Sequence, residues 1–67
     1  MKITKDMTIQ QVLEVDRRAA AVFMRHGMFC IGWPGAANEN LEQAAMGHGI
    51  DLNVLLQDLN ALLETEA

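Results

Sequence analysis

The segment Cys30-Ile31-Gly32-Trp33-Pro34 contains the only cysteine of the chain. Its spacing is that of a Cys-x-x-Cys redox motif in which tryptophan replaces the second cysteine. Proline suits the first position of a helix, so Cys30 would lie just before a helix N-terminus, where free N–H groups stabilise a thiolate. His26, four residues earlier, and His48 are candidate modulators. Cys30 is therefore the candidate reactive thiol of this protein.

A second interpretation makes Cys30 structural. Free cysteine is among the most buried residue types and often behaves as a small hydrophobe, and the residues around Cys30 are apolar. A thiol buried among them would be less acidic and inert. The sequence leaves both interpretations open.

The same loop is a candidate contact surface for another protein. Trp33 beside Pro34 would provide an aromatic anchor, because tryptophan is enriched at the energetic centres of interfaces. The residues that we expect to bind a partner are Met28, Phe29, Ile31, Gly32, Trp33 and Pro34. Met24 and Met46 fall outside the inward helical stripes, so they either fill gaps in a thin core or extend an exposed apolar patch.

A metal site is not expected. His26, His48 and Cys30 supply three ligands, whereas structural zinc normally takes four at recognisable spacings. We therefore predict no metal and no cofactor. The one exception that a single cysteine would allow is an iron–sulfur cluster shared across a dimer.

Four segments with helical periodicity must position this loop. Each begins at a residue able to cap a helix, and these residues are Thr8, Asp16, Asn40 and Asp51. Thr8 with Gln11, and Asn40 with Gln43, have the spacing of capping boxes. The last helix is the clearest, because leucines recur on one face. These leucines are Leu52, Leu55, Leu56, Leu59, Leu62 and Leu63.

Two glycines predict helix ends. The second helix should run from Asp16 to about His26 and stop at Gly27, and the third should stop at Gly49, since glycine readily adopts the left-handed conformation that ends helices. His26-Gly27-Met28 and His48-Gly49-Ile50 repeat one pattern of helix end, glycine and apolar residue. His48 continues the inward face of the third helix, so we expect it to be partly buried. The predicted fold is all-α: a compact bundle of about four short helices, with the cysteine loop between the second and third.

Size and charge narrow the possible functions. The 67 residues make a single helical domain, 1–67, with a thin core, for which a homodimer would be a natural source of added stability. The net charge of −4 argues against nucleic-acid binding, which needs clustered basic residues. No apolar run approaches the ~20 residues that cross a membrane. A lone cysteine fits a reducing compartment, so we expect a cytoplasmic protein.

The order of these motifs resembles a known family. Residues 4–34, "TKDMTIQQVLEVDRRAAAVFMRHGMFCIGWP", and residues 41–63, "LEQAAMGHGIDLNVLLQDLNALL", are similar to small bacterial and archaeal domains of unknown function described as hybrid-cluster-protein-associated (prismane-associated) redox disulfide domains. The chain also resembles the N-terminal module of di-iron proteins that repair iron–sulfur clusters. The resemblance implies a helical bundle with dithiol chemistry in the loop, and only Cys30 can be carried over.

The missing second cysteine decides how the resemblance is interpreted. An intramolecular disulfide cycle needs an attacking and a resolving thiol, and Trp33 stands where the second would be. We therefore expect a helical interaction module that is not itself an enzyme, and that binds a partner protein or a second copy of the chain. The alternative is a monothiol accessory protein of redox or iron–sulfur metabolism that acts through Cys30.

Overall fold

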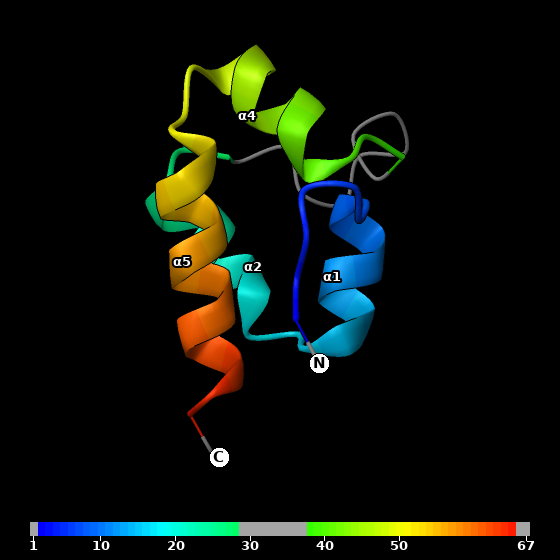
Figure 1. The fold of residues 1–67 in the computed structure, drawn as a ribbon, viewed down its shortest axis with the longest axis vertical. Helices are drawn as coiled ribbons and strands as arrows, with labels where there is room; N and C mark the ends of the chain where they lie inside the picture. Colours follow the sequence, from blue (N-terminus) through cyan, green and yellow to red (C-terminus); the bar gives the residue numbers. More distant parts are fainter. Residues whose placement is uncertain (1, 29–37, 66–67) are drawn as a thin grey trace.

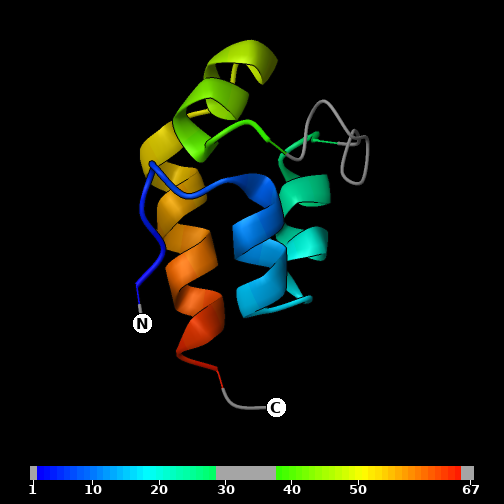
Figure 2. The ribbon, with the colours of Figure 1, turned by 90° about the vertical axis from the view of Figure 1, so that its right-hand side faces the viewer.

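A computed structural model describes residues 2–28 and 38–65 of the chain. Its helices are α1 (Ile9–Val15), α2 (Ala19–Arg25), α4 (Leu41–His48) and α5 (Leu52–Leu63). Figures 1 and 2 show α1, α2 and α5 packed side by side, with α4 across one end. Within the described ranges there is no strand, so the predicted all-α class is confirmed. None of these helices is long and apolar enough to cross a membrane.

The core is formed where α5 packs against α2 and α4, and where α1 packs against α2. Phe23 is its largest fully buried side chain. The predicted leucine stripe of α5 faces this core: Leu55 and Leu59 are fully buried, and the other four leucines pack against the buried cluster. The apolar residues that form the core are Ile3, Ile9, Val12, Ala19, Val22, Phe23, Met28, Leu41, Ala44, Ala45, Leu55 and Leu59.

The side chain of Asn60 in α5 binds the backbone of Ile3 in the N-terminal segment. The amide of Asn60 accepts a hydrogen bond from the Ile3 N–H at 2.8 Å and donates one to the Ile3 carbonyl at 3.1 Å. It therefore pairs with Ile3 as a neighbouring strand would. The Ile3 side chain is buried in the core, so this pairing satisfies backbone groups that would otherwise be costly to desolvate.

The N-termini of α1 and α4 are joined to each other. The Ile9 N–H donates to the Glu39 carbonyl at 3.1 Å, and the Leu41 N–H donates to the Met7 carbonyl at 2.9 Å. These bonds form an antiparallel bridge between Thr8 and Asn40, the two residues that cap the helices. Each helix thus has its first N–H satisfied by the segment that leads into the other.

Both predicted capping boxes are present. The Thr8 hydroxyl accepts from the Gln11 N–H, and the Gln11 side chain accepts from the Thr8 N–H. Asn40 and Gln43 repeat the arrangement in α4. The Asp51 carboxylate caps α5 by accepting from two backbone N–H groups, as its position in the sequence predicts.

The second helix differs from the prediction at its start. It begins at Ala19, because the Asp16 carboxylate accepts from the Arg18 N–H and forms a turn that precedes the helix. The Arg18 guanidinium binds the same carboxylate at 2.7 Å and donates to the Leu62 and Thr65 carbonyls at the end of α5. The hydrogen bonds from Arg18 lower the pKa of Asp16 below its ordinary value.

The ends of α2 and α4 are built alike. The Met28 N–H donates to the Phe23 carbonyl at 2.9 Å, and the Ile50 N–H donates to the Ala45 carbonyl at 2.8 Å. In each case the preceding glycine has positive φ, 85° at Gly27 and 68° at Gly49. This is the six-to-one bond of a Schellman motif, so the repeated His-Gly-apolar pattern has a structural meaning.

We predict that Gly27→Ala and Gly49→Ala each destabilise the protein by about 1–2 kcal/mol, the cost of left-handed backbone for an L-residue. Apart from the glycine and its two chain neighbours, no atom of the described residues lies within 4 Å of the added methyl group at either position, so we attribute the penalty to the backbone. The matched control is Gly47→Ala inside α4, which should stabilise by about 0.5–1 kcal/mol. Urea unfolding measures all three, and equal effects at Gly47 and Gly49 would contradict the assignment.

We also predict that Asn60→Ala destabilises the fold by about 1–3 kcal/mol, because it removes the partner of the Ile3 backbone groups. Asn53→Ala is the control on the same helix, since its side chain forms no hydrogen bond with any described residue. Urea denaturation should separate the two variants clearly. Similar midpoints would show that Asn60 does not hold the N-terminal segment.

Candidate functional site

The structure fixes both sides of the segment that contains the cysteine motif. On one side, Met28 follows the Schellman end of α2 and is fully buried, with 0% of its surface exposed. On the other side, the Glu39 carbonyl accepts a hydrogen bond from the Ile9 N–H, and Asn40 caps α4. The two sides of the loop are therefore attached to the core and to the α1–α4 junction.

Most of the predicted binding residues lie in this segment. Phe29, Cys30, Ile31, Gly32, Trp33 and Pro34 fall outside the residues that the structure describes. Met28 is described, and the prediction that it contacts a partner needs correction: its side chain is enclosed by the core and is unavailable for contact. Met28 anchors the loop because an apolar residue after a helix-ending glycine commonly packs back onto the helix.

His26, predicted as a modulator of the thiol, has a partner that sequence reasoning missed. Its Nε2 lies 2.7 Å from Oδ2 of Asp58 in α5. The imidazole is largely covered, with 16% of the side chain exposed, whereas 43% of the Asp58 side chain is exposed. This contact fixes the ring against α5, two residues before Met28. His26 and Asp58 are separated by 32 positions in the sequence, so no local spacing could have revealed the pair.

The other candidate side chains lie on the outside of the bundle. His48 is exposed at the end of α4, which corrects the expectation of partial burial. Met24 and Met46 are also exposed, at 51% and 80% of their surfaces, so they do not fill gaps in the core. Among residues 2–28 and 38–65, no three His, Cys, Asp or Glu side chains are placed to hold a metal ion.

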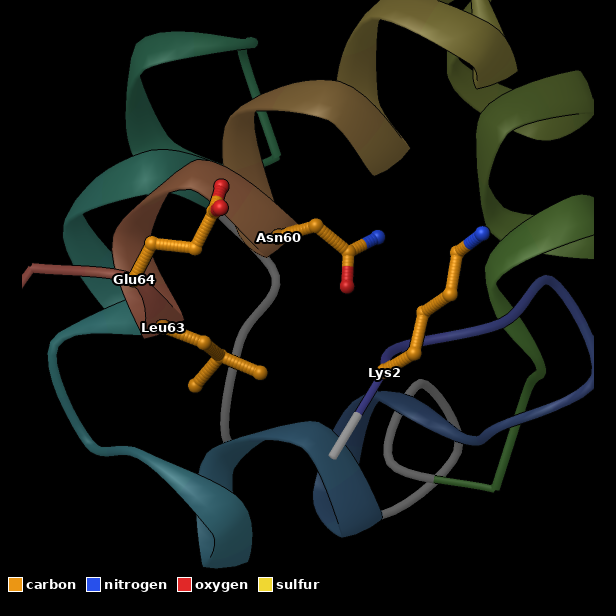
Figure 3. A pocket seen from close by; sticks show the side chains of 4 residues that line it. All are labelled: Lys2, Asn60, Leu63 and Glu64. Carbon is orange, nitrogen blue, oxygen red and sulfur yellow. The ribbon is translucent and has the colours of Figure 1, made fainter.

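A hollow of about 400 Å³ lies on another side of the molecule, between the N-terminal segment and the end of α5. Figure 3 shows Lys2 across this hollow from Leu63 and Glu64, with Asn60 between them. A second hollow, of about 550 Å³, adjoins the same Asn60 and Ile3. Asn60 already uses its amide to hold Ile3 and the Leu56 carbonyl, so its hydrogen bonds explain its place there without a ligand.

Known proteins share this fold. The family described as "Domain of unknown function (DUF1858)" matches residues 3–56, and the chain belongs to that family. A protein from Clostridium thermocellum, solved by NMR, shares 47% sequence identity with this chain. The two structures match with a TM-score of 0.85 over 96% of this chain and 91% of the other. The solution structure of an uncharacterized protein from Methanocaldococcus jannaschii is 46% identical, with a TM-score of 0.87, over 98% and 92%. No curated protein matches the chain.

The His26–Asp58 contact gives a quantitative prediction. In a double-mutant cycle with His26→Ala, Asp58→Ala and the double variant, we expect a coupling free energy of about 0.5–1 kcal/mol, the upper part of the range for partly exposed ion pairs. Chemical denaturation of the four proteins at pH 6 measures it. A coupling near zero would mean that the contact does not hold the imidazole against α5.

Proposed function

We propose that this protein is a small helical interaction module that binds a partner protein through the cysteine-containing loop. The observation that carries the proposal is the attachment of the loop on both sides, through buried Met28 and through the Glu39–Ile9 bond. A loop whose two ends are held by the fold loses less conformational entropy on binding than a segment of the same length with free ends. Trp33 and Pro34 would supply the apolar contact.

The resemblance to redox disulfide domains supports a role beside redox proteins, and the lone thiol limits that role. A mixed disulfide at Cys30 could be resolved only by a thiol from outside the chain, since the sequence contains one cysteine. Catalysis of disulfide exchange by the protein alone is therefore not part of the proposal. A single thiol also suits a reducing compartment, which supports a cytoplasmic location.

A second candidate function is favoured by the His26–Asp58 contact. A carboxylate that binds one ring nitrogen of a histidine orients the ring and directs its other nitrogen. His26 lies two residues before Met28, so such an ordered imidazole would be available near the start of the loop. On this basis the protein would be a monothiol accessory in redox or iron–sulfur metabolism, with Cys30 as the reactive group.

Variants in the loop separate these functions. If the loop docks, Trp33→Ala should weaken capture of the cellular partner by the purified protein at least tenfold, as expected for loss of an aromatic anchor, while Cys30→Ser should leave capture unchanged. The amount of partner retained on immobilised protein, measured by quantitative mass spectrometry, reports both. Loss of capture with Cys30→Ser but not with Trp33→Ala would favour the thiol function instead.

The rate of Cys30 alkylation against pH tests the second candidate directly. A pH midpoint of the alkylation rate well below the ~8.5 of a free thiol would establish an activated thiolate at Cys30. The substitution His26→Ala should then raise that pH midpoint. Labelling that occurs only after unfolding would rule out the thiol function and would leave the docking proposal intact.

A further inference from the structure

The methionine at position 46 contributes almost nothing to the folded core. Met46 lies in α4 and has 80% of its surface exposed. An apolar side chain that stays in water gains no burial energy. Glutamine or lysine would suit an exposed helical position equally well, because their helix propensities are close to that of methionine. The stability of the fold therefore does not explain Met46.

The face of α4 that carries Met46 is open. Figure 1 shows α4 across one end of the bundle, with Leu41, Ala44 and Ala45 buried. The next residue, Gly47, is exposed. Apart from its chain neighbours and the backbone of its own helix, no atom of the described residues lies within 4 Å of a methyl group placed on Gly47. Solvent and small solutes therefore reach the Met46 thioether without any movement of the fold.

The other methionines in the described part of the chain are covered to different degrees. Met24 is 51% exposed, Met7 is partly buried against the core, and Met28 is fully enclosed. An oxidant must touch the sulfur atom to react with it, so exposure controls which methionines are oxidised. Met46 should react first, and Met28 only when local opening of the structure exposes it.

We propose that Met46 is a site of reversible oxidation by peroxides. With hydrogen peroxide, the sulfur lone pair attacks one oxygen, so an S–O bond forms as the O–O bond breaks. The departing hydroxide takes the proton of the transferred hydroxyl and leaves as water. The thioether loses two electrons and becomes a sulfoxide, and the peroxide gains them. Met46 lies outside the cysteine loop, so this proposal stands independently of the function proposed above.

The exposed position also permits the reverse reaction in the folded protein. A methionine sulfoxide reductase returns the sulfoxide to the thioether: two thiols become a disulfide, and the oxygen leaves as water. The reductase must surround the side chain, and the open face of α4 allows this. Oxidation makes the side chain polar, which is tolerated where it already contacts water. At Met28 the same change would place a polar group in the core.

The test treats the folded full chain with hydrogen peroxide and follows oxygen uptake at each methionine by peptide mass spectrometry. Met46 should oxidise at a rate within about threefold of that of a free methionine derivative, and Met24 more slowly. Met28 should react at least about tenfold more slowly than Met46 until urea unfolds the protein. Reductases specific for the two sulfoxide epimers, supplied with dithiothreitol, should together restore Met46 without unfolding.

A pair of variants tests whether the fold tolerates the polar form. Met46→Gln, a polar side chain of similar length, should keep the urea midpoint of the original protein, whereas Met28→Gln should lower it. A lower midpoint with Met46→Gln would overturn the proposal that both forms of the side chain share one fold.

Three further outcomes would overturn the inference. Oxidation of Met46 no faster than that of Met28 would show that the thioether is covered in solution. A Met46 sulfoxide that the reductases remove only after unfolding would make the reaction irreversible in the folded protein. Loss of Met46 oxidation in Cys30→Ser would show that the reaction depends on the thiol and not on the exposure of Met46.

Discussion

The structure depends most on the reciprocal bonding of two helix N-termini. Every α-helix begins with N–H groups that have no partner inside the helix, and here the first N–H of α1 and that of α4 are each satisfied by the segment leading into the other. The capping boxes at Thr8 and Asn40 satisfy further donors at the same place. Because this junction links residues more than 30 positions apart, it holds the two helices together and fixes where the cysteine loop returns to the bundle.

Polar side chains stabilise this fold in places where a larger protein would rely on its hydrophobic core. A short chain buries a smaller share of its surface than a long one. In this protein Asn60 holds the N-terminal segment through its amide, and Arg18 donates to the carbonyl of Leu62 in the last turn of α5 and to that of Thr65 just after the helix. Each satisfies backbone groups at an exposed edge of the bundle, where unpaired groups would weaken the packing beneath them.

The helical architecture is shared with other proteins. Two solved structures keep the same fold at 46–47% identity, and a fold of this kind is compatible with many functions. The side chains of the cysteine loop are chemically distinct from this support: the loop carries the single thiol of the sequence, Cys30, with Trp33 three residues after it. In the proposed function these side chains make the contacts, and the helical bundle supports them.

The sequence by itself determined the helices and most of their ends, because capping boxes, helix-ending glycines and a leucine stripe act through residues only a few positions apart. The prediction from sequence was wrong at the start of the second helix, where local signals compete. The Asp16 carboxylate accepts from the Arg18 N–H and forms a turn, so α2 begins at Ala19 and not next to Asp16. Only the tertiary structure decided that Met28 is buried and that His48 is exposed, because burial depends on which elements pack together. For the same reason, only the folded chain could pair His26 with Asp58 and Ile3 with Asn60, since these contacts join residues 32 and 57 positions apart.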